Sequence, residues 1–76
     1  MDTEGRSLSA LVKEIRRQLS LSQEDLARQL GVSYATVNRW ENGLSKPSKL
    51  AKAQLESFCK KMTSQGKLTL PEGERR

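Results

Sequence analysis

The residues best suited to specific chemistry in this sequence are hydrogen-bonding side chains gathered between residues 33 and 49. Arg39 can donate a fork of hydrogen bonds, Asn38 can both donate and accept, and Tyr34 can stack or donate. This chemistry suits recognition of a polar surface rather than the breaking of bonds. Any exposed helix shows a polar face, however, so these residues alone do not distinguish recognition from ordinary solvation.

The sequence offers few of the residues on which catalytic and metal sites depend. Its 76 residues contain no histidine and one cysteine, Cys59. A His-based catalytic triad and a structural zinc site therefore lack the side chains they require. A domain this small also buries only ~60% of its unfolded surface, which leaves little room for an enzyme cleft. We expect no enzymatic activity, no cofactor, no metal and no small-molecule ligand.

Charge and hydropathy favour a small cytoplasmic domain with an anionic partner. There are 14 Lys and Arg against 9 Asp and Glu, a net charge of +5, and basic domains often bind polyanions such as nucleic acids. Most of the excess lies beyond residue 50, where a solvated helix face explains it equally well. No apolar run approaches the ~20 residues that span a bilayer, and no signal-peptide core follows Met1. A single cysteine favours a reducing cytosol.

Apolar spacing and capping residues predict the first two helices, which must position the polar segment. An apolar stripe at helical spacing predicts the first helix and consists of Leu8, Leu11, Val12, Ile15 and Leu19. Ser22, with Asp25 three residues later, predicts a capping box at the start of the second helix. Gly31 can adopt the positive φ that ends this helix.

The same signals predict two further helices. Ser33 caps a third helix over about residues 34–41, with Val37 and Trp40 facing inward. The connection around Gly31 is only three or four residues long, which suits the near-perpendicular crossing of a helix-turn-helix. Ser48 caps a fourth helix, whose apolar stripe consists of Ala51, Leu55, Phe58 and Met62.

These segments together resemble the lambda-repressor-like (XRE/Cro-type) helix-turn-helix family. The resemblance runs from about Leu11 to Phe58 and rests on four segments at the family's spacings: Leu19-Ser-Leu-Ser-Gln-Glu-Asp-Leu-Ala27, Leu30-Gly-Val-Ser33, Val37-Asn-Arg-Trp-Glu-Asn-Gly43 and Lys46-Pro-Ser48. It implies an all-α bundle of four to five short helices, with the helix-turn-helix formed by helices 2 and 3. It further implies sequence-specific binding of double-stranded DNA by a prokaryotic or phage-type transcriptional regulator.

The resemblance also assigns DNA contacts. With its apolar side anchored, the third helix would enter the major groove and face the bases with Tyr34, Ala35, Thr36, Asn38 and Arg39. Arginine suits guanine, asparagine suits adenine, and Ala35 or Thr36 can touch a thymine methyl group. The start of the second helix and the segment around the third would hold phosphates, through Gln23, Ser33, Asn42, Ser45, Lys46 and Lys49.

A separate group is expected to position the third helix without touching DNA: Arg16, Ala27, Gly31, Val37, Trp40 and Glu41. In related repressors an arginine of the first helix pairs with the glutamate that ends the third, and Arg16 and Glu41 match those positions. A partly buried pair would set the angle of the third helix, while desolvation of the two charges would offset part of its attraction.

The remaining organisation stays open at this point. Residues 1–6 are expected to form a flexible arm, residues 7–62 the domain, and residues 63–76 a tail or linker. Met62 is expected to help close the core, whereas Leu68 and Leu70 could instead lie across a partner. A short strand over residues 67–70 has no evident partner strand.

Three alternatives to a free-standing regulator also remain. The chain could be the N-terminal DNA-recognition module of a larger protein such as a DNA-modifying enzyme, or an antitoxin-like regulator. It could also be a helical bundle that only binds other proteins. A single unit reads few base pairs, so homodimerisation on DNA or attachment to a larger protein is expected.

Overall fold

Four α-helices account for most of the residues that the structure describes. The computed structural model describes residues 4–69, with side chains from residue 8 onward, and its helices are α1 (Glu4–Leu19), α2 (Gln23–Leu30), α3 (Tyr34–Glu41) and α4 (Lys49–Ser64). Within those residues no segment is a strand. The all-α architecture expected from the sequence is confirmed. None of the described helices combines the length and apolarity needed to cross a membrane.

Serine caps begin three of the helices, as the sequence predicts. Ser22 Oγ accepts a hydrogen bond from the Asp25 N–H at 2.9 Å, and the Ser22 N–H donates to Asp25 Oδ2 at 3.2 Å. Ser33 and Ser48 each accept from the backbone N–H three residues later, both at 3.1 Å. Each cap satisfies a donor that the start of a helix leaves unpaired, so these helices begin at defined residues.

Each of the four described helices is followed within two residues by a residue in the left-handed region: Ser20, Gly31, Gly43 and Gly66. Gly31 follows α2 with φ +74°, and the Val32 N–H donates to Ala27 O at 3.0 Å. Ser20 follows α1 with φ +56°, and the Leu21 N–H donates to the carbonyl five residues back at 3.0 Å. Both turns provide hydrogen-bond donors for carbonyl groups in the last turn of the helix. The turn at Gly31 lets α3 begin four residues after α2 ends.

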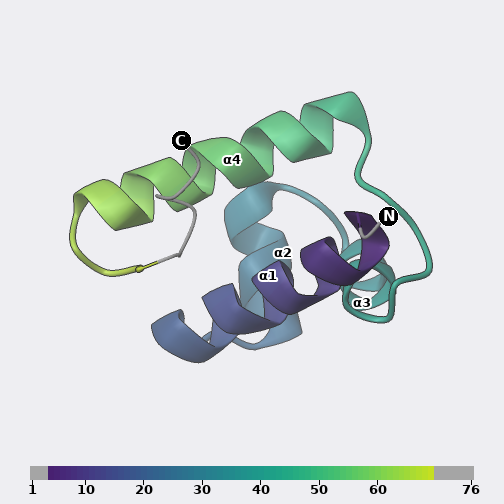
Figure 1. Ribbon diagram of the computed structural model, residues 1–76, viewed down its shortest axis with the longest axis horizontal. Coiled ribbons are helices and arrows are strands. Elements are labelled where there is room, and N and C mark those ends of the chain that lie inside the picture. Colours follow the sequence, from purple (N-terminus) through teal and green to yellow (C-terminus); the bar gives the residue numbers. More distant parts are fainter. Residues whose placement is uncertain (1–3, 70–76) are drawn as a thin grey trace.

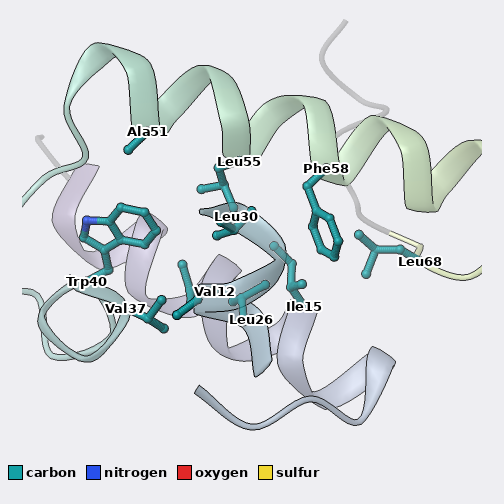
Figure 2. Close-up of a cluster of buried hydrophobic side chains, with 11 residues drawn as sticks. Val12, Ile15, Leu26, Leu30, Val37, Trp40, Ala51, Leu55, Phe58 and Leu68 are labelled. Carbon is teal, nitrogen blue, oxygen red and sulfur yellow. The ribbon is translucent and has the colours of Figure 1, made fainter. Parts of the chain in front are cut away.

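The core is one cluster that draws on all four helices. Figure 2 shows it beneath α4, with Ala51 and Trp40 toward one end and Phe58 and Leu68 toward the other. Its buried members are Val12, Ile15, Leu26, Ala27, Leu30, Val37, Trp40, Ala51, Leu55, Phe58 and Leu68. Burial of a large apolar side chain contributes ~1.5–3 kcal/mol, so the helices are fixed mainly by this cluster.

Both ends of the helical region differ from the expected boundaries. α1 already begins at Glu4, inside the segment expected to be a flexible arm; residues 1–3 lie outside the described residues. α4 continues to Ser64, two residues beyond the expected end of the domain. Once a helix is nucleated and packed, each added residue gains a hydrogen bond. Helices therefore extend past their last apolar residue, which a periodicity argument does not detect.

The segment that follows α4 folds back onto the domain (Figure 1). The chain reverses at Gly66, with φ +75°, and places Leu68 in the core at 2% exposure. Thr69 N–H donates to Gln18 Oε1 at 2.8 Å, and Gln18 Nε2 donates to Thr69 O at 2.9 Å. Leu68 is therefore unavailable to a partner, and residues 67–69 form no strand; Leu70 lies outside the described residues.

Candidate nucleic-acid interface

One face of α3 fastens this helix to the domain. Val37 is fully buried and Trp40 is 1% exposed, and both lie in the core cluster (Figure 2). Glu41 is also buried, and α3 contacts both α1 and α2. Residues three and four apart share a helix face. The side of α3 opposite to these anchors therefore points away from the domain.

Three of the five residues expected to face DNA bases are exposed on α3, two of them on its outward side and one in its first turn. Tyr34 is 54% exposed, and Ala35 and Arg39 are also exposed. Thr36 and Asn38 are half-buried at the margins of this face. Thr36 Oγ1 lies 2.9 Å from Ser33 Oγ, so this hydroxyl already has a hydrogen-bond partner within the chain.

The residues expected to hold phosphates occupy three places. Asn42, Lys46 and Lys49 are exposed in the loop after α3 and at the start of α4, and Ser45 is half-buried between them. Ser33 is exposed at the start of α3 and serves as its cap. Gln23 is half-buried at the first position of α2, where the helix dipole favours an anion.

An ion pair joins α1 to the end of α3. Arg16 Nε donates to Glu41 Oε2 at 2.6 Å, and Arg16 Nη2 donates to Glu41 Oε1 at 3.0 Å. The third arm of the guanidinium, Nη1, donates to Leu21 O at 3.1 Å. The structure thus contains the pair that the family resemblance implied, and its two-point geometry fixes both the distance and the rotation between the helices.

The surroundings of Glu41 determine its charge. Burial alone would raise the pKa of Glu41, but hydrogen bonds from Arg16 and Gln23 outweigh it and leave the pKa below its usual value. The carboxylate is therefore ionised at neutral pH and acts only as a hydrogen-bond acceptor. Ser9 Oγ donates to the backbone carbonyl of Glu41 at 2.5 Å, which is a second link from α1 that the sequence did not indicate.

A row of side-chain amides crosses from α2 to α3. Gln23 Nε2 donates to Glu41 Oε1 at 2.9 Å, and Gln23 Oε1 accepts from Asn38 Nδ2 at 3.2 Å. Asn38 Oδ1 accepts in turn from Asn42 Nδ2 at 3.1 Å. Sequence reasoning placed Gln23 on a phosphate and Asn38 on a base, and missed that they bond to each other. Only the spacing of Asn38 and Asn42, four apart at the end of α3, signalled a contact.

The helix-turn-helix region matches a known protein family. A family model described as helix-turn-helix matches residues 12–56, which include α2, α3 and the turn between them. The chain belongs to this family. Its helix-turn-helix domain is of the lambda-repressor-like, XRE type that the sequence segments resemble, and membership implies DNA binding. Among the described residues, the helix-turn-helix domain gathers no group of three potential metal-ligating side chains.

Part of a known enzyme is also similar to the helix-turn-helix domain. The Type II methyltransferase M1.ScrFI of Lactococcus lactis subsp. cremoris is 41% identical over 49 residues, which cover 60% of this chain and 13% of the methyltransferase. The chain thus corresponds to a small part of that protein's length. No solved structure matches the chain.

Proposed function

We propose that the chain binds double-stranded DNA sequence-specifically, with α3 in the major groove, and acts as a prokaryotic or phage-type transcriptional regulator. The observation that carries this proposal is the division of α3 into two faces. Val37 and Trp40 anchor one face in the core, while Ala35 and Arg39 stand exposed on the other and Tyr34 is exposed in the first turn. The major groove admits one α-helix and displays a distinct hydrogen-bonding pattern for each base pair.

In this proposal the outward residues of α3 read the bases. Arg39 donates two hydrogen bonds to guanine O6 and N7, and Asn38 pairs with adenine N6 and N7. Tyr34 stacks or donates, Thr36 touches a thymine methyl group, and the small side chain of Ala35 permits close approach of the helix. A good bidentate contact contributes ~1–3 kcal/mol of discrimination between bases.

The phosphate contacts fix the position of α3 in the groove. Lys46, in the loop after α3, and Lys49, at the start of α4, supply exposed positive charge, and each phosphate neutralised releases counterions from the DNA. The starts of α2 and α3 offer backbone N–H groups to phosphates. The side chains assigned to this role are Gln23, Ser33, Asn42, Ser45, Lys46 and Lys49.

One unit contacts only a few base pairs, so we infer that two copies bind together. Helix-turn-helix dimers place their recognition helices about 34 Å apart, one turn of B-DNA. A homodimer would then bind a site with two-fold symmetry.

A second candidate function follows from the similarity to the methyltransferase. The matching 49 residues make up 13% of that protein, so this chain could supply the DNA-recognition part of a larger DNA-modifying protein. In that case the chain binds DNA and the reaction is carried out elsewhere. The α3 contacts would be the same, but the bound site need not be symmetric.

Selection of bound sequences from a random duplex pool tests these proposals. Enrichment of a palindrome with half-sites one helical turn apart supports a dimeric regulator, and enrichment of a single asymmetric site supports a recognition module. Titration of the selected duplex at two salt concentrations should show binding that weakens steeply as salt rises. Absence of enrichment, with no binding at either concentration, would reject DNA recognition and favour a protein-binding bundle.

A further inference from the structure

The hydrogen bonds along the row of amides all donate toward Glu41. Asn42 donates to Asn38, Asn38 donates to Gln23, and Gln23 donates to Glu41. At the far side, Arg16 donates to both oxygens of the same carboxylate. Every amide in the row therefore presents its nitrogen toward Glu41 and its oxygen away from it.

The charge at the end of the row explains this order. An ionised carboxylate has no hydrogen to donate, so the part of Gln23 that faces Glu41 must be its NH₂ group. The carbonyl of Gln23 then faces α3 and can only accept, which requires Asn38 to direct its own NH₂ group toward Gln23. The two ends of a free asparagine amide exchange places by a 180° rotation. Here that rotation would place two oxygens or two nitrogens against each other at both ends of Asn38.

We propose that Gln23 is a specificity-determining positioning residue, which holds the Asn38 amide in one orientation and so sets the base preference where Asn38 meets DNA. This inference rests on the proposed function of α3 in the major groove. It adds to that function a residue of α2 that acts through Asn38 rather than on the base itself.

The orientation of Asn38 matters because adenine offers its acceptor N7 and its donor N6 in a fixed order. After the bonds to Gln23 and Asn42, Asn38 keeps one N–H hydrogen and one acceptor lone pair. A fixed amide offers this donor and acceptor in one order only. A freely rotating amide can turn to make single hydrogen bonds with other bases, which reduces discrimination.

A phosphate contact by Gln23 would have a different effect. Its Nε2 carries a second hydrogen that is not given to Glu41, so one side chain can hold Asn38 and also donate to a phosphate. Loss of a phosphate contact weakens binding to all sequences about equally. Loss of the bond to Asn38 instead flattens the preference at one base pair. The two roles are therefore separable by experiment.

The test uses the duplex selected from the random pool and its single-base-pair variants. Asn38→Ala first identifies the base pair that Asn38 reads, as the position where discrimination is lost. Gln23→Met then removes both amide hydrogen bonds while keeping a side chain of similar length. Gln29→Met makes the same change at an exposed position of α2 and serves as the matched control. Asn42→Ala removes the hydrogen bond to Asn38 Oδ1. Asn42 is exposed, so this substitution puts folding least at risk.

We expect Gln23→Met to reduce discrimination at the Asn38 base pair by about fivefold or more, although Asn38 itself is intact; this corresponds to the lower end of a bidentate contact. Asn42→Ala should also reduce discrimination at this base pair, and Gln29→Met should leave the discrimination unchanged. Uniform weakening by Gln23→Met, with the preference at that base pair retained, would overturn the inference while leaving DNA recognition standing. Failure of the unaltered chain to prefer any duplex would instead remove the proposed function, and this inference with it.

Discussion

Arg16 of α1 and Glu41 of α3 meet through two hydrogen bonds of 2.6 and 3.0 Å, although they lie 25 residues apart in the chain. The carboxylate is 5% exposed and the arginine side chain 26% exposed, so water screens the pair only in part. The same carboxylate ends the row of amides that reaches Asn38. One buried charge therefore connects the packing of α3 to the residues on its outward face.

Arg16→Ala should lower stability and DNA binding together. Removal of one partner leaves the buried charge of Glu41 uncompensated, and we expect a loss of about 2–4 kcal/mol in the free energy of unfolding. Arg16→Lys keeps the charge but not the two-point geometry, so its stability and its affinity for DNA should lie between those of the unaltered chain and Arg16→Ala. Urea unfolding and titration of the selected duplex measure both effects. Unchanged stability with unchanged affinity would show that the pair does not position α3.

Acid should remove the contribution of Glu41 to stability. The pKa of Glu41 in the folded state lies below its usual value, because the hydrogen bonds from Arg16 and Gln23 outweigh the effect of burial. A lowered pKa means that the stabilisation is complete above about pH 5 and is lost as pH falls through the folded pKa. Glu41→Gln should therefore be less stable than the unaltered chain at pH 7.

Urea unfolding at intervals from pH 7 to pH 3 measures that difference. We expect the stability gap between the unaltered chain and Glu41→Gln to narrow toward acid. Glu14→Gln offers an exposed comparison on α1: hydrogen bonds from Arg17 and Gln18 lower the pKa of Glu14 to about 2, so its contribution is also lost toward acid, but water screens this group and its stability gap should be smaller. A gap that stays constant across the range would mean that Glu41 has the same pKa in folded and unfolded chains.

Ser20→Gly should stabilise the domain. Ser20 adopts φ +56° at the end of α1, a conformation that costs a residue with a Cβ roughly 1 kcal/mol and glycine very little. The greater flexibility of glycine in the unfolded chain reduces this gain, so we expect an increase of about 0.5 kcal/mol. Ser64→Gly, in the last turn of α4, is the contrasting variant and should destabilise instead. Thermal unfolding of both variants distinguishes the two signs.

Leu68→Ala should destabilise the domain although Leu68 lies beyond the last helix. The side chain is 2% exposed and belongs to the core, and truncation of a buried leucine costs about 2–5 kcal/mol. Leu50, at 72% exposure, provides the control, since Leu50→Ala should change stability by less than about 0.5 kcal/mol. Equal effects of the two substitutions would show that the segment after α4 contributes nothing to the fold.

Local features of the fold could be predicted from the sequence because their partners are close along the chain. The Ser22 cap bonds to Asp25 three residues away, and Gly31 needs only its own backbone freedom. The inward position of Val37 and Trp40 follows from helical spacing. The family resemblance added the pairing of Arg16 with a distant glutamate, which no local pattern indicates.

Contacts between distant side chains could not be predicted in this way. Gln18 and Thr69 form hydrogen bonds although they lie 51 positions apart. Leu68, next to Thr69, is a single buried leucine and so gives no periodic signal in the sequence. The family resemblance implied a phosphate contact for Gln23 at the start of the second helix. Its actual partners depend on the angle at which α3 crosses α2, which is fixed by the core as a whole rather than by either helix.

The most direct test of DNA reading by α3 compares the unaltered chain with its Tyr34→Ala/Arg39→Ala variant. For each chain, affinity is measured for the selected duplex and for a scrambled duplex. Lys60→Ala, on the exposed side of α4, controls for the loss of a positive charge. We predict that the double variant keeps its helical circular dichroism spectrum and loses the preference, whereas Lys60→Ala retains it. Full discrimination by the folded double variant would contradict the assignment of the outward face of α3 as the surface that reads DNA.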